Sequence, residues 1–433
     1  MNFSETEVCT GLAAFSPSGE WLAVAKGSNL SVRETSTGRQ IATFPGLEPI
    51  SSLEWSPDSG FLLCAFLKRA TLQVFSISDS QFCGKITSAR PLGSARWSPD
   101  SKSLIGIQEF QLQLIIWSLT TCAIVAIRSP KHGEAGLDFS RDGRFMALIE
   151  KNEGKDQVGV YFTGDWTQVR LFPTETSSAE DLLWTSRGQI VVWEGLLASN
   201  CLVYSPEGSL VGKILLEGLT MGVKDAESSG QFLALGLNEP IVRVISTISW
   251  KPLADFQHSA ILPNTHSPIY QETEQTIPGD FSTAARTTVH FTSLKSLSKP
   301  PNTKSSKSFP CPISSLSWSF ESRYLATRCE LTPCIVHIWS TDPYTLAATL
   351  SFLSPIRSLA WSPTRPMLAI ATGGGSLYLW SEEGAAICEI PKNPDAAFSV
   401  FKSKWNSTGS ALLLMDRCAI RMAYPQFEAA LSP

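Results

Sequence analysis

The stretch Trp55-Ser56-Pro57-Asp58-Ser59 decides how this chain folds, because the same short pattern returns along the whole sequence. An aromatic residue is followed by Ser, Pro, Asp or Ser, then Ser or Gly, and an apolar run such as Phe61–Ala65 comes next. The copies, some degenerate, are anchored at residues 15, 55, 97, 139, 184, 226, 318, 361 and 405. Successive anchors lie 40–45 residues apart, except for one step of 92 residues from 226 to 318. This regularity indicates a protein built from one repeated supersecondary unit. We expect the tryptophans of the pattern to be buried where the inner strand meets the neighbouring blade, namely Trp55, Trp97, Trp318, Trp361 and Trp405.

Each period contains four short segments with strand character. The inner strand precedes the turn, as in residues 50–55, and a short apolar strand follows the turn. A third strand ends in an aromatic residue and Ser, as in residues 114–118, and a more polar fourth follows, as in residues 40–44. Pro fixes φ at the second turn position, and Asp or Gly closes the hairpin. Four strands in 40–45 residues predict an all-β, WD40-type β-propeller with nine candidate blades.

A single ring of nine blades is favoured, and a seven- or eight-bladed ring with extra strands is the alternative. We expect Met1–Ser4 to close the ring as the outer strand of the last blade; the other candidate is Tyr424–Leu431. The long step is explained by an inter-blade insertion at residues 258–312, nearly half of which is Ser, Thr or Pro. Residues 1–257 then form blades one to six and residues 313–433 form blades seven to nine. We predict no stable core in residues 263–310, where 289–291 are the most strand-like.

Composition excludes several classes of protein. With 43% hydrophobic and 17% charged residues, the chain of 433 residues is neither disordered nor a coiled coil. A net charge of −4 gives no basic field for nucleic acid, so no direct nucleic-acid contact is expected. No apolar run reaches the ~18 residues of a membrane span, and the acidic start is unlike a secretion signal. We expect a soluble intracellular protein with ten reduced cysteines and no zinc cluster.

The sequence contains no recognisable catalytic motif. It has no G-x-S-x-G, no phosphate-binding G-x-x-x-x-G-K-[ST] and no H-E-x-x-H. Asp58 and Asp100 recur at the turn, so we interpret them as turn formers rather than a catalytic pair. Gly373-Gly374-Gly375 lies between two strands and is interpreted as a hairpin turn. We therefore predict no catalytic, cofactor-binding or metal-binding residue, no cofactor and no enzymatic activity.

Two groups of residues are candidates for partner binding. Hairpin turns between second and third strands share one propeller face with the loops that enter the inner strands. The candidates on this face are Lys68, Arg69, Glu109, Phe110 and Arg328, and exposed aromatic and Arg side chains are typical interface anchors. The second group is a basic arm in the insertion, open to phosphorylation and to acidic partners. It contains Lys295, Lys299, Lys304 and Lys307.

From Met1 to about Trp405 the chain resembles the spindle-pole and centrosome family of WD-repeat proteins. The resemblance is carried by loops and strand ends as well as by blade positions. Its specific parts include Glu54-Trp55-Ser56, Asp142–Leu148, Leu353–Arg357 and Leu377–Ser381. The chain departs from ordinary WD40 repeats because the terminal Trp-Asp is Trp-Ser and the Gly-His dipeptide is lost, Gln257-His258 being its nearest relic. This puts the buried Asp–His–Ser–Trp network of typical WD40 blades in question.

The resemblance implies a non-enzymatic scaffold in the cytoplasm and cytoskeleton, at the spindle pole body or centrosome. It implies binding to a coiled-coil microtubule-anchoring protein and to a minus-end-directed kinesin-14, and contact with γ-tubulin-associated pole components. Such a complex anchors microtubule minus ends and supports spindle organisation. Two alternatives stay open. One is an RNA- or ribosome-associated propeller resembling those of translation initiation factors, which would carry a basic face with stacking aromatics. The other is a propeller hydrolase.

Overall fold

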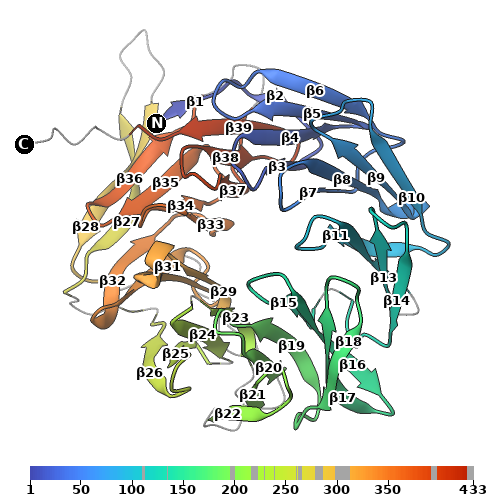
Figure 1. Cartoon of the computed structure of the whole chain (residues 1–433). Helices are drawn as coiled ribbons and strands as arrows, with labels where there is room; N and C mark the ends of the chain where they lie inside the picture. The colour runs from blue at the N-terminus through green and yellow to red at the C-terminus, as the bar shows by residue number, and fades with distance from the viewer. Residues whose placement is uncertain are drawn as a thin grey trace, which may run out of the picture.

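The strands lie in nine separate sheets arranged around a ring (Figure 1). This computed structural model covers residues 1–433, and the structure is described except at 110–112, 134, 196–199, 216–222, 229, 238, 260, 262–265, 278–285, 298–312, 392–396 and 427–433. Apart from the added strands β1, β2, β27 and β28, the inner strand of each blade comes first in the chain, and each strand pairs antiparallel with the next. The prediction of a nine-bladed, all-β propeller is therefore confirmed.

The first five blades follow one another without interruption. Blade one contains β3 (Ala13–Phe15), β4 (Trp21–Lys26), β5 (Asn29–Glu34) and β6 (Gln40–Pro45). Blade two contains β7 (Ser52–Trp55), β8 (Phe61–Phe66), β9 (Thr71–Ser76) and β10 (Cys83–Thr87). Blade three contains β11 (Leu92–Trp97), β12 (Ser103–Gln108), β13 (Gln113–Ser118) and β14 (Ile124–Arg128). Blade four contains β15 (Leu137–Phe139), β16 (Phe145–Asn152), β17 (Lys155–Phe162) and β18 (Gln168–Pro173). Blade five contains β19 (Ala179–Trp184), β20 (Ile190–Glu194), β21 (Asn200–Tyr204) and β22 (Leu210–Leu215).

The last four blades include the insertion and the closure of the ring. Blade six contains β23 (Val223–Ser228), β24 (Phe232–Leu237), β25 (Ile241–Ser246) and β26 (Pro252–Gln257). Blade seven contains β29 (Ile313–Trp318), β30 (Tyr324–Cys329), β31 (Ile335–Thr341) and β32 (Tyr344–Ser351), with β27 (Ile269–Ile277) and β28 (Arg286–Leu294) added outside β32. Blade eight contains β33 (Ser358–Trp361), β34 (Leu368–Ala371), β35 (Ser376–Ser381) and β36 (Gly384–Glu389). Blade nine contains β37 (Lys402–Trp405), β38 (Leu412–Met415) and β39 (Ala419–Tyr424), with β1 (Asn2–Phe3) and β2 (Glu7–Val8) paired to β39.

In blades two, three, eight and nine the tryptophan that ends the inner strand ties its blade to the one before it. The indole Nε1 of Trp55 donates to the Ala14 carbonyl at 2.9 Å, and that of Trp405 donates to the Ala360 carbonyl at 3.0 Å. Trp55, Trp97 and Trp318 are buried, as the repeat predicts.

Two other tryptophans are less buried than the repeat predicts. Trp361 and Trp405 are only half-buried, because they line an open pocket between β33 and β37. The prediction that both would be buried is therefore wrong, although each keeps its indole hydrogen bond to the preceding blade.

The Ser-Pro-Asp turn folds on its own hydrogen bonds. The Ser56 hydroxyl donates to Asp58 Oδ1 at 2.6 Å and accepts from the Phe61 amide at 2.8 Å, while the Gly60 amide donates to Asp58 at 3.0 Å. Ser98 and Asp100 repeat this arrangement. This supports the interpretation of Asp58 and Asp100 as turn formers. In the equivalent turn of blade four, Gly143 has a left-handed backbone with φ 68°. A Cβ added there would lie 2.7 Å from Cβ of Pro99, so the turn requires glycine at this position.

N-terminal strands close the ring, as predicted. Asn2 pairs with Tyr424 and Phe3 with Ala423, so Met1–Ser4 supplies the outer strand of blade nine. A second strand, β2, then pairs with the other half of β39. Tyr424 itself belongs to β39, and residues 427–431 of the alternative closing strand lie outside the described residues.

The prediction that residues 263–310 form no stable core is wrong for β27 and β28. These strands form a hairpin, and β27 runs parallel to β32 in blade seven. Phe291 packs against Tyr270, Phe352 and Tyr378, with ring centroids 5.8–6.2 Å apart. Ile269 and Leu297 are buried against blade seven. The composition of the segment concealed this packing because only a few apolar residues carry it, Ile269 and Leu297 in one cluster and Tyr270 and Phe291 in another.

Candidate functional site

Lys68 and Arg69 lie in the turn between the second and third strands of blade two. This turn is a single 3-10 turn, η1 (Leu67–Arg69), which Ala70 closes with a left-handed backbone at φ 49°. Both basic side chains are exposed, and Arg69 makes an ion pair with Glu48 in the preceding loop. An exposed ion pair contributes little to stability, so these charges are available to a partner.

Glu109 lies at the equivalent turn of the neighbouring blade, next to η1 on the same propeller face. Its side chain is exposed, and its amide donates to the Pro91 carbonyl at 3.1 Å. Phe110, the aromatic residue predicted to anchor a partner, lies outside the described residues. Lys68, Arg69 and Glu109 thus lie at equivalent turns of two neighbouring blades, on the same propeller face.

Arg328 lies near the end of β30 in blade seven. Blade seven, with β29, β31 and β32, lies across the ring from blade two (Figure 1). The Arg328 guanidinium donates to Ser314 Oγ at 2.8 Å and to the Ile356 carbonyl at 3.0 Å, and it pairs with Glu330 at 3.1 Å. These bonds join the end of blade seven to the loop that enters blade eight. Arg328 is therefore held by its own chain and is not grouped with Lys68 and Arg69.

Only the first lysine of the predicted basic arm is described. Lys295 is exposed directly after β28, and Lys299, Lys304 and Lys307 lie outside the described residues.

Sequence reasoning missed a set of carboxylates on the inner strands. Glu54 accepts from the Trp97 amide at 3.1 Å, and Asp138 accepts from the Trp184 amide at 2.6 Å. Burial raises the pKa of both carboxyl groups. The available signal was an acidic residue directly before the aromatic anchor in blades two and four. Their hydrogen bonds run between neighbouring blades, so we assign them to ring assembly.

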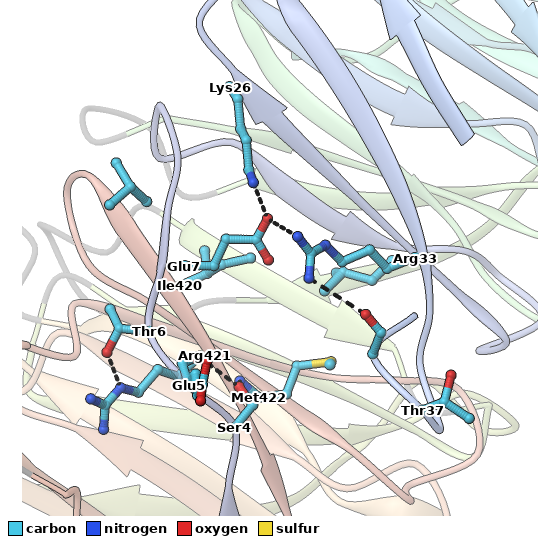
Figure 2. Close-up of a pocket in the computed structure, with 13 residues that line it drawn as sticks. Ser4, Glu5, Thr6, Glu7, Lys26, Arg33, Thr37, Ile420, Arg421 and Met422 are labelled. Atoms are coloured by element: carbon cyan, nitrogen blue, oxygen red, sulfur yellow. Dashed lines mark hydrogen bonds and ion pairs between the residues drawn. The ribbon is translucent and has the colours of Figure 1, made fainter. Parts of the chain in front are cut away.

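A charged pocket of about 500 Å³ lies where blade nine meets blade one (Figure 2). Figure 2 shows Lys26 and Arg33 pointing toward Glu7, at 2.6 and 2.8 Å from its carboxylate. Arg421, a buried residue on the other side of the pocket, donates to Thr6 Oγ1 at 2.5 Å and to the Pro391 carbonyl. The Glu7 carboxylate of β2 is thus matched by two basic side chains of blade one across the closure of the ring. A single sequence gives no signal for the hydrogen bond from Arg421 to Thr6, since these two residues come from opposite ends of the sequence.

Blade seven keeps part of the hydrogen-bond network of ordinary WD40 blades. His258 Nε2 lies 2.7 Å from Thr327 Oγ1, and the Trp339 indole donates to the same oxygen at 2.9 Å. The relic dipeptide Gln257-His258 therefore supplies the histidine of this network. Burial lowers the pKa of His258 to about 4 and holds that of the neighbouring His337 well below its usual value.

Two further observations concern the described part of the chain. No group of three or more His, Cys, Asp or Glu residues there could hold a metal ion. No helix in the described ranges is long and apolar enough to cross a membrane.

Comparison with known proteins places these features in a family. The model of the WD domain, G-beta repeat, matches residues 344–381. Over 96% of its length the chain is 32% identical to the mouse WD repeat-containing protein WRAP73, of which it covers 94%. The chain belongs to the WRAP73 family. It is a WD40 propeller scaffold related to that protein.

The solved structures that resemble this member of the WRAP73 family support the assignment of its fold and nothing further. The C-terminal WD40 domain of Sif2 is 14% identical with a TM-score of 0.54, over 87% of this chain and 96% of that one. A eukaryotic initiation factor is 11% identical with a TM-score of 0.60, over 92% of each chain. At these identities the likeness carries no argument for a ribosome-associated role.

Proposed function

We propose that the chain is a non-enzymatic scaffold of the spindle pole or centrosome, in the cytoplasm and cytoskeleton. It binds a coiled-coil microtubule-anchoring protein and a minus-end-directed kinesin-14, and through them meets γ-tubulin-associated pole components. The complex anchors microtubule minus ends and supports spindle organisation. Two things support this proposal: the resemblance to pole proteins across the blades, and the full-length relationship to WRAP73.

The η1 turn is the observation that carries the choice of docking face. It presents two adjacent exposed basic side chains, with Glu48 paired to Arg69 and Glu109 at the equivalent turn of the next blade. Mixed charges of this kind complement the charged flanks of a coiled-coil helix, where Glu and Lys alternate at the positions next to the apolar seam. Because the blade's core does not need these side chains, changing them tests binding without disturbing the fold.

The test is a double charge reversal, Lys68→Glu with Arg69→Glu, in the full chain. We expect affinity for the purified coiled-coil partner to fall at least tenfold, which is about 1.4 kcal/mol, with an unchanged melting temperature. The matched control is Lys102→Glu with Arg141→Glu, the same charge change at exposed turns on the opposite face. Binding should also weaken as salt is raised, since exposed charges are screened.

The outcomes separate the docking face from the function. Equal binding by both variants would remove η1 from the interface, and loss only in the control would place the site on the opposite face. Absence of any binding by the unmodified chain to the coiled-coil partner would overturn the proposed function itself.

A further inference from the structure

Two cysteines face each other where the ring closes. The pairing of β2 with β39 joins Glu7 to Ile420 and Val8 to Ala419 in antiparallel register. The next residues along the two strands are Cys9 and Cys418, and the Cys9 amide donates to the Cys418 carbonyl at 2.9 Å. The antiparallel register therefore continues by one residue, and the two cysteines are direct partners across it.

This position suits a disulfide. Directly opposed residues of an antiparallel pair have Cα atoms about 4.5–5.5 Å apart and side chains on the same face. Disulfides span Cα distances of about 4.4–6.8 Å, so no movement of the backbone is needed. Both thiols are free, Cys9 buried at 6% exposure and Cys418 exposed. Burial raises the pKa of Cys9, and the nearby Glu7 and Cys418 add to the rise, as expected for two adjacent thiols.

We propose that Cys9 and Cys418 are a redox modification site that takes a peroxide as its oxidant and locks the ring with a reversible disulfide. The exposed Cys418 thiolate attacks one peroxide oxygen, giving a sulfenic acid and the first water (or alcohol). Sγ of Cys9 then attacks Sγ of Cys418; the S–S bond forms, the S–O bond breaks, and the thiol proton leaves with the second water. Two thiols lose two electrons and the peroxide gains them. A small thiol reverses the step by exchange.

The chain offers a matched control pair. Cys64 on β8 and Cys83 on β10 are also a buried and an exposed thiol, close enough for Cys83 to raise the pKa of Cys64. However, β9 lies between their strands. Two strand spacings amount to about 9.5 Å, which is beyond the reach of a disulfide. Cys122 is a lone exposed thiol that reports simple surface oxidation.

The experiment uses the full chain treated with hydrogen peroxide and then blocked with an alkylating agent. Peptide mapping without reductant should find the Cys9–Cys418 cross-link, with a loss of ~2 Da and recovery on adding dithiothreitol. The oxidised chain should melt at least ~3 °C higher, because the cross-link spans nearly the whole chain and restricts its unfolded state. Cys418→Ser should lose both effects, and Cys83→Ser should keep them.

Three results would overturn the proposal. The first is a map in which Cys9 stays alkylated while Cys418 and Cys122 are oxidised alike. The second is a cross-link between Cys64 and Cys83 at the same yield. The third is a rise in melting temperature that persists in Cys418→Ser. Peptide mapping of the unmodified sequence shows whether the Cys9–Cys418 cross-link forms, even if a serine variant folds poorly.

Discussion

Replacing Trp97 by alanine tests the packing between blades two and three most directly. The side chain is 4% exposed and packs in one cluster with Leu63, Leu72 and Leu104. A buried tryptophan hides about 200 Å² of surface, which at about 25 cal/mol per Å² amounts to roughly 5 kcal/mol before the cavity relaxes. The indole also donates to the Glu54 carbonyl at 3.4 Å, a long and weak bond. We therefore expect Trp97→Ala to lower the free energy of unfolding by about 3–5 kcal/mol.

Denaturant unfolding followed by tryptophan fluorescence and circular dichroism measures this change. The matched control is Trp405→Ala, at the same position of the repeat but only half-buried, which should lower stability by a smaller amount. Trp97→Phe should recover part of the loss, because most of the apolar contact is kept. Equal effects of Trp97→Ala and Trp405→Ala would refute the reasoning, since burial is what distinguishes the two positions.

Three further predictions concern other parts of the ring. Glu272→Ala in β27 removes the acceptor of the buried Tyr378 hydroxyl and should destabilise the chain by about 1–3 kcal/mol in denaturant melts; an unchanged midpoint would show that the hairpin is dispensable. His258 and His337 stay neutral in the fold while the unfolded chain takes up protons below about pH 6.5, so the melting temperature should fall as the pH falls from 6.5 toward 4. A double variant, His258→Gln with His337→Gln, should show a shallower fall, and an equal slope would contradict this. Glu7→Gln should lower stability by about 1 kcal/mol at low salt and less at high salt, in thermal melts at two ionic strengths; salt-independent loss would exclude the ion pairs as its cause.

The blades could be predicted from the sequence because their signal is local and repeated. Ser56, Pro57 and Asp58 form a turn by contacts among neighbouring residues, and the same three residue types recur one period later in the sequence. Register within a blade follows from the same local pattern. The N-terminal closing strand could be proposed because one end of the chain is expected to supply the outer strand of the last blade, and Met1–Ser4 is the favoured candidate over Tyr424–Leu431.

The remaining features depend on contacts that no local pattern shows. Composition alone assigns Phe291 to an inter-blade insertion, yet its ring packs against Tyr378 in blade eight. Trp361 is the same residue type at the same repeat position as Trp97, yet it is half-buried because it lines the pocket between β33 and β37. Among the partner candidates, sequence could not show that Arg328 is held by Ser314 and Ile356, because these bonds join separate strands and loops.

Closure of the ring by β1 and β2 also fixes the order in which this protein can be completed during synthesis. Ser4 and its partner Met422 are 418 residues apart. At about 5–20 residues per second, a ribosome makes the second roughly 20–80 s after the first. For that interval the early blades stand in an open arc, and the N-terminal strand has no sheet to join. Blade nine is thus the last to form, and a nascent chain that stops before β39 leaves Glu7, Lys26 and Arg33 on an unfinished edge.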